Sequence, residues 1–348
     1  MKIPPRRLWA RHTGKTARSG LAGRRRGIAT GSVAALCVAA TVTGCQAGGD
    51  AASGSGQITV SASPGVADAP LYLAAREGLF AKAGLKVTIK SSSSDAASLH
   101  ALTKGKADVA SADYADFFYV QANVDPGLRI VADGYDAAPN VTEVLTLPRS
   151  GITTPQGLVG KTIGTPQPQE FPYQPSAPYS LDTLATQSVL LNDGIQPTQV
   201  HWKAMPAQNL ISALSSGQVN AILVSEPYIF QAESQLGATE VIDSLSGSAA
   251  SLPLSGYFTQ SSFARDHAAT LRTFQSVLLR AQAEAATGQG VRTALAKASQ
   301  MNTLTAYMVT LGVYPASLNV SGVQQLTNLM AEYSMLGAPV DVAALTFK

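Results

Sequence analysis

The chain has 348 residues, of which 45% are hydrophobic and 14% carry a formal charge, a balance that supports a folded core and excludes a disordered chain. Nine of the 25 Lys and Arg residues fall within residues 1–44, which hold no Asp or Glu, so residues 45–348 keep sixteen basic against 22 acidic residues. This negative body argues against nucleic-acid binding, which needs a basic footprint on the folded domain.

Residues 1–44 have the three-part pattern of a signal peptide. A basic stretch ends at Arg24, Arg25 and Arg26, and residues 28–42 are small and apolar. That apolar stretch of about 15 residues is shorter than the roughly 20 needed to span a bilayer, so we expect cleavage rather than an uncleaved anchor helix. Arg25 and Arg26 allow twin-arginine as well as Sec export, and the sequence leaves that choice open.

The leader closes with Val-Thr-Gly-Cys at residues 42–45, which resembles a bacterial lipobox. The resemblance implies that Cys45 is joined to diacylglycerol, with palmitate, and becomes the new N-terminus. Cys37 lies in the leader, so the body has no thiol for a disulfide, a metal site or catalysis. Residues 45–56 form a Gly-, Ser- and Ala-rich flexible tether. We therefore expect a lipid-anchored protein on the extracytoplasmic face of the cell membrane.

The body begins with an alternation of short strands and helices. We expect strands at residues 58–61, 85–89 and 107–110, and helices at 70–84, 95–104 and 114–122. Pro70 in the first turn and Gly84 at the exit support the first helix. This βαβαβα order predicts a mostly parallel sheet with helices on both faces.

The same rhythm returns after residue 160. We expect strands at 162–164, 200–204 and 220–224, and helices at 180–194 and 206–217, the first of them capped by Ser180. Residues 266–287, 291–301, 303–311 and 322–335 all have helical patterns. The predicted fold class is therefore α/β, with two doubly wound lobes and a helical C-terminal region.

Several strings, in order, resemble the type II solute-binding proteins of ABC importers, a family that includes sulfonate, taurine, nitrate and thiamine-precursor binders. The strings are at residues 69–74, 77–80, 83–87, 99–102, 105–110, 150–152, 158–164, 214–221 and 226–228. The resemblance implies the type II periplasmic-binding-protein fold, in which two crossing strands join the lobes. It places lobe 1 at residues 57–146 plus 255–348, lobe 2 at 147–254, and the ligand in the interlobe cleft.

The resemblance also implies a function, which is to deliver a small molecule to an ABC permease, with the protein acting as a monomer. Two alternatives stay open: a sulfonate- or nitrate-type anion binder, and a ligand-sensing lipoprotein without transport. An enzyme on this scaffold is disfavoured, because the pyrimidine-synthesising relatives need Cys- and His-based chemistry. His100, His201 and His267 show no pairing at helical spacing, so we expect no catalytic residue, metal or cofactor.

Ligand contacts are expected in the loops that follow strands, where clefts of open α/β sheets lie. Asp68, Asp95, Asp113 and Glu226 occupy such loops, and no Arg or Lys does, which favours a neutral or cationic ligand, possible classes being aromatic or nitrogenous molecules. The alternative for the three aspartates is helix N-capping, worth about 1 kcal/mol each. Neighbouring candidates for ligand contact in these loops are Ser94, Tyr114 and Tyr228.

The segment PQPQEFPYQPSAPYS at residues 166–180 is rich in proline and aromatic residues. Its functional interpretation is a stiff lid over the cleft, in which Gln167, Tyr173 and Tyr179 contact a ring or an amine. The alternative is a surface loop packed on its own lobe.

Overall fold

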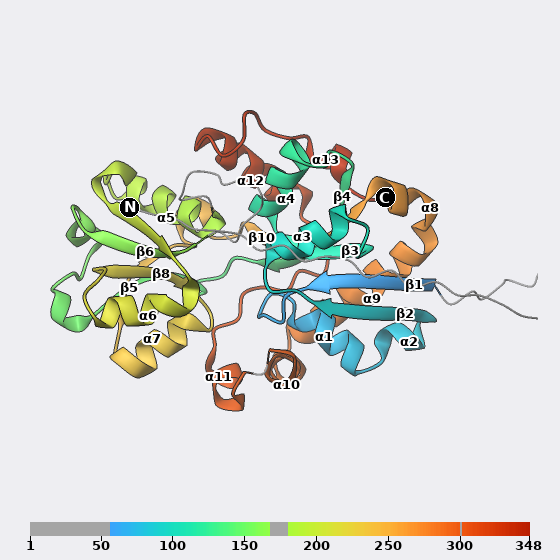
Figure 1. Cartoon of the computed structure of the whole chain (residues 1–348), viewed down its shortest axis with the longest axis horizontal. Helices are drawn as coiled ribbons and strands as arrows, with labels where there is room; N and C mark the ends of the chain where they lie inside the picture. The colour runs from blue at the N-terminus through green and yellow to red at the C-terminus, as the bar shows by residue number, and fades with distance from the viewer. Residues whose placement is uncertain (1–55, 168–179, 300) are drawn as a thin grey trace, which may run out of the picture. The chain divides into compact units, whose positions relative to one another are not determined.

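The computed structural model of the chain describes residues 56–167, 180–299 and 301–348 (Figure 1). Residues 1–44, expected to form a signal peptide, Cys45, expected to carry the lipid, and Tyr173 and Tyr179 of the proline-rich segment therefore lie outside the described residues.

Short strands alternate with helices along the first two thirds of the body, and helices dominate the last third. The strands are β1 (Gly56–Ala62), β2 (Leu85–Ser91), β3 (Val109–Asp113), β4 (Leu128–Asp136), β5 (Thr142–Thr146), β6 (Thr162–Pro166), β7 (His201–Met205), β8 (Ala221–Ser225), β9 (Thr239–Asp243) and β10 (Pro253–Gln260). The helices are α1 (Ala69–Arg76), α2 (Leu79–Lys82), α3 (Asp95–Thr103), α4 (Tyr114–Asn123), α5 (Leu181–Asn192), α6 (Ala207–Ser215), α7 (Tyr228–Leu236), α8 (Ser261–Asp266), α9 (Ala268–Ala285), α10 (Gln289–Ala298), α11 (Thr303–Met308), α12 (Val320–Glu332) and α13 (Val342–Leu345).

The first sheet has the order β2-β1-β3-β10-β4, and only β10 runs antiparallel to its neighbours. Ile58 and Val60 of β1 pack against α1, α2 and α9, while Phe258 of β10 faces the opposite layer. There it stacks on Phe117 of α4, with the ring centroids 4.0 Å apart. Helices α1 and α2 lie on one side of this sheet, and α3 and α4 on the other (Figure 1). We call this sheet with its helices the first lobe.

The second sheet has the order β7-β6-β8-β5-β9, with β5 antiparallel to both of its neighbours. Alternate residues of β8 enter two separate cores. Ile222 and Val224 pack with α6 and α7, and Leu223 packs with Leu190 of α5. We call this sheet with its helices the second lobe. Both lobes thus have helices on both faces of a mostly parallel sheet, which confirms the predicted fold class.

Two chain segments connect the lobes. The chain leaves the first sheet after β4 and enters the second at β5, and it returns between β9 and β10. Residues 142–146, which the sequence placed at the end of lobe 1, form β5 of the second sheet. The helix expected over residues 70–84 is divided into α1 and α2 by Gly78, which has a left-handed φ of 66°.

The C-terminal helices complete the first lobe. Helix α9 packs on α1 and on β1, β2 and β4, α10 packs on α1, and α12 packs on β10. Val313 pairs with Asp136 at the end of β4. Among the helices of the described residues, none combines the length and the apolar composition needed to cross a membrane.

Candidate ligand-binding site

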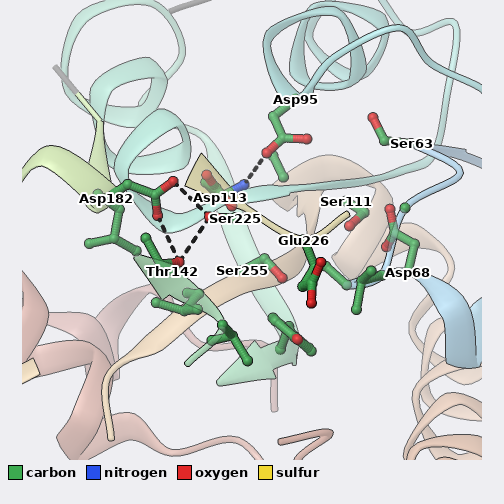
Figure 2. A pocket seen from close by; sticks show the side chains of 18 residues that line it. Ser63, Asp68, Asp95, Ser111, Asp113, Thr142, Asp182, Ser225, Glu226 and Ser255 are labelled. Carbon is green, nitrogen blue, oxygen red and sulfur yellow. Dashed lines mark hydrogen bonds between the residues drawn. The ribbon is translucent and has the colours of Figure 1, made fainter. Parts of the chain in front are cut away.

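A cavity of about 250 Å³ lies at the carboxyl ends of the strands, with residues of both lobes around it (Figure 2). The first lobe supplies the loop after β1, the end of β3 and the start of α3. The second lobe supplies the start of α5 and the end of β8. Strands β4 and β10 of the first sheet contribute Tyr135, Leu254 and Ser255, and the segment between β4 and β5 contributes Val141. The fold therefore places this cavity where ligands bind in open α/β sheets.

Five carboxyl groups line the cavity. Asp68, Asp95 and Asp113 come from the first lobe, and Asp182 and Glu226 from the second. Within the described part of the chain, no Lys or Arg belongs to the lining. When these groups are ionised, the cavity presents a field of one sign, which attracts cations and repels anions.

The first-lobe carboxylates are held by neutral donors. Asp68 is 4% exposed, and its Oδ1 accepts a hydrogen bond from the Tyr257 hydroxyl at 2.9 Å. Burial raises the pKa of Asp68 to about 7, although hydrogen bonding by Ser111 and Tyr257 acts to lower it. Asp95 Oδ2 accepts the backbone N–H of Asp113 at 3.0 Å. Burial also raises the pKa of Asp95 and that of Asp113, and the nearby Asp95 charge adds to the effect on Asp113.

These aspartates do not cap helices through their side chains. Asp68 and Asp113 occupy the N-cap positions of α1 and α4, yet neither side chain accepts a capping hydrogen bond. Helix α3 is capped by Ser94, whose Oγ accepts the N–H of Ala97 at 3.2 Å. Ser94 therefore has a capping role and lies outside the cavity lining, whereas the aspartate side chains line the cavity.

The second-lobe carboxylates are also fixed by neighbours. Asp182 accepts hydrogen bonds from the Ser225 hydroxyl at 3.1 Å and from the Thr142 hydroxyl at 3.5 Å. Glu226 Oε1 accepts the backbone N–H of Thr310 at 2.8 Å, and its Oε2 accepts that of Phe230 at 3.2 Å. Burial is the main cause that raises the pKa of both carboxyl groups. Since Thr310 belongs to the first lobe, the Glu226 hydrogen bond joins the two lobes.

The structure brings together four of the residues expected from sequence, namely Asp68, Asp95, Asp113 and Glu226. Besides Ser94, three others lie outside the cavity lining. Tyr114 is fully buried, and its hydroxyl donates to Asp133 in the first-lobe core. Tyr228 is half-buried against the second-lobe core, and Gln167 is exposed after β6.

Sequence reasoning missed Asp182 and Ser255. Asp182 lies in the first turn of α5, as Asp95 lies in the first turn of α3, and this shared placement could have found it. Ser255 lies on β10, is 4% exposed, and its Oγ has no hydrogen-bond partner. Because a buried hydroxyl without a partner is costly, Ser255 is a ready contact for a bound molecule.

Across the described ranges, no cluster of His, Cys, Asp and Glu is arranged to hold a metal ion.

Comparison with known proteins identifies the family. Residues 67–289 match the family model described as NMT1/THI5 like, whereas no curated protein sequence matches the chain. The structure is similar to the periplasmic aliphatic sulphonate binding protein SsuA from Escherichia coli, with a TM-score of 0.68 and 18% identity over 84% of this chain and 97% of that one. It is also similar to the periplasmic nitrate-binding protein NrtA from Synechocystis PCC 6803, with a TM-score of 0.63 and 12% identity over 83% and 84% of the two chains.

An enzyme shares the architecture as well. The desulfurization enzyme DSZB has a TM-score of 0.61 and 13% identity over 84% of this chain and 96% of its own. At these identities the likeness establishes a common fold and leaves the ligand to the site itself. The protein is thus a member of the NMT1/THI5 like family with the two-lobed fold of periplasmic solute-binding proteins.

Proposed function

We propose that this protein is a lipid-anchored extracytoplasmic solute-binding protein that captures a small neutral or cationic nitrogenous molecule and delivers it to an ABC permease. The observation that carries the proposal is the cavity itself, which has five carboxyl groups and no Lys or Arg among its described lining residues. The family and the fold support the transport role, and the residues 42–45 motif supports the lipid anchor at Cys45.

The charge of the cavity separates this ligand class from the anions named for the structural neighbours. Two unit charges 4 Å apart interact by about 4 kcal/mol at an effective dielectric constant of about 20. An anion beside even one ionised carboxylate of this cavity would meet that repulsion, and the described lining offers no cation in return. A cationic or hydrogen-bond-donating ligand would gain charge-assisted hydrogen bonds from the same groups.

The arrangement suggests how capture would work. Asp68, Asp95 and Asp113 lie on the first-lobe wall, and Asp182 and Glu226 lie on the second-lobe wall. A donor-rich ligand between the walls would bind both lobes at once and stabilise the closed arrangement. The permease would then recognise the ligand-bound form, as expected for a binding protein of this fold.

An enzymatic role is the weaker candidate, although DSZB has the same fold. Residues 46–348 contain no cysteine, and the expected fate of Cys45 is lipidation, so thiol catalysis in the cavity has no nucleophile. A ligand-sensing lipoprotein without transport would use the same cavity, and a permease encoded beside the protein would favour transport.

A thermal-shift panel on the purified full-length chain tests the ligand class. The panel holds alkylamines, thiamine-related pyrimidines, aromatic heterocycles, sulfonates and nitrate. A ligand at 100 times its Kd adds about 2.7 kcal/mol of stability, which is a readable shift in Tm. We expect shifts with amines or nitrogen heterocycles. A shift confined to sulfonates or nitrate would contradict the charge argument and establish the anion alternative.

A further inference from the structure

The carboxylates extend along the cavity from one end to the other. Figure 2 shows Asp182 and Asp68 on opposite sides of the cavity, with Asp113 and Asp95 between them. The electrostatic contacts follow the same order: Asp113 is affected by the charges of Asp182 and Asp95, and Asp68 by that of Asp95. Carboxyl groups therefore extend through the whole site.

The carboxylate at each end is already oriented, and its partners are uncharged. Asp182 is held by the Ser225 and Thr142 hydroxyls, and Asp68 by the Tyr257 hydroxyl. Each carboxylate has about four lone-pair sites, so both ends can still accept hydrogen bonds from a ligand. A compact cation, such as a single ammonium group, would reach one end and leave the other end without a counter-charge.

The lining also contains a polar group that has no partner in the protein. Ser255 Oγ is buried, lines the cavity and forms no hydrogen bond. Buried hydroxyls normally have a partner, so this one indicates that the cavity accommodates a molecule that supplies it. The observation is independent of the carboxylates, because Ser255 lies on β10 of the first sheet.

The size of the cavity limits the ligand. Its volume is about 250 Å³. A short linear chain with a nitrogen at each end fits that volume, whereas a large polycation would extend outside it.

We propose that the ligand carries two cationic nitrogens, one paired with Asp182 and Asp113 and the other with Asp68, as in a short linear diamine. This inference rests on the proposed solute-binding function and specifies its substrate class. The two lobes would then be joined by the ligand itself, because Asp182 and Asp68 belong to different lobes.

Isothermal titration calorimetry on the full-length protein tests the proposal with butane-1,4-diamine and with butan-1-amine, which has the same chain and one charge. Measurements at about pH 8 lie above the pKa of about 7 that burial gives Asp68. One additional hydrogen bond between charged groups contributes about 1.5–3 kcal/mol, so the diamine should bind at least about tenfold more tightly. Propane-, pentane- and hexane-diamines then report the preferred nitrogen spacing.

The variants Asp182→Asn and Asp68→Asn should each reduce the diamine-to-monoamine affinity ratio by about tenfold and leave monoamine binding at the other end. Asp193→Asn is the matched control, because Asp193 is exposed at the other end of the helix that carries Asp182. This control should keep the full ratio.

The outcomes separate the inference from the proposed function. If the monoamine or a neutral heterocycle binds as tightly as every diamine, the two-cation inference is overturned and the solute-binding proposal stands. If only sulfonates or nitrate bind, or nothing in either panel binds, both are overturned. A diamine preference that survives in both variants would also overturn the assignment of Asp182 and Asp68.

Discussion

Replacing Asp68 by Asn should stabilise the ligand-free protein while it impairs ligand binding. Burial raises the pKa of Asp68 from its ordinary 3.8 to about 7. The folded state therefore holds the proton more tightly than the unfolded state does. Stability from this group is fully present below pH 3.8 and is lost as the pH rises towards 7, because ionisation is resisted only in the folded protein.

The magnitude follows from that shift. About three pKa units at about 1.4 kcal/mol each mean that the Asp68 carboxyl lowers the unfolding free energy by at most about 4 kcal/mol at about pH 8. The same relation gives about 2 kcal/mol at about pH 5. Asn cannot ionise, and its carbonyl oxygen can still accept the hydrogen bond from Tyr257. The stability gained by Asp68→Asn should therefore be larger at the higher pH.

Urea unfolding of the ligand-free protein and of Asp68→Asn at both pH values measures this difference. Asp193→Asn serves as the exposed control and should change stability little at either pH. A gain that is equal at the two pH values, or a loss of stability at about pH 8, would refute the explanation that burial of an ionised Asp68 destabilises the ligand-free fold.

Three further predictions concern ligand binding, membrane anchoring and the core. Amine binding should weaken as the pH falls from about 8 to about 5.5, because Asp68, whose pKa burial raises to about 7, becomes protonated in this range, and calorimetry across these pH values would show it. An amine affinity that stays constant across this pH range would contradict a role for the cavity carboxylates. Cys45→Ser should remain unprocessed and lack diacylglycerol by mass spectrometry, and a lipid mass on that variant would exclude the lipobox. Phe258→Ala should cost about 3–5 kcal/mol of unfolding free energy, because the ring is fully buried against Phe117, and a loss below about 1 kcal/mol in urea unfolding would show that the core repacks there.

Much of the fold could be predicted because short alternating strands and capped helices leave a local pattern. Strands β4 and β9 were not predicted, for different reasons. Both faces of β4 are buried, so its residues show no clean alternation, and β9 is an edge strand with exposed Thr239 and Glu240. Only the paired structure shows that β5 belongs to the second sheet.

The candidate site was predicted in part. The sequence pattern indicated four of its residues because each lies at the end of a predicted strand or in the loop after it: Asp68, Asp95, Asp113 and Glu226. Asp182 lies in the first turn of α5, directly after the proline-rich segment, and the preceding strand β6 ends well before it, at Pro166. Direction was the second difficulty: Tyr114 follows Asp113 immediately, yet its side chain enters the core while the Asp113 side chain lines the cavity.

The hydrogen bond between Glu226 and Thr310 links the cavity to an outer surface of the protein. Thr310 follows helix α11, where Leu304 and Met308 are 63% and 56% exposed. The Glu226 carboxylate thus lines the cavity and also accepts a hydrogen bond from the segment that follows a helix with exposed apolar side chains. A partner that binds α11 and alters this hydrogen bond would change the affinity of the cavity for its ligand. Thermodynamic linkage makes this coupling reciprocal, so the ligand would change the affinity for that partner by the same factor.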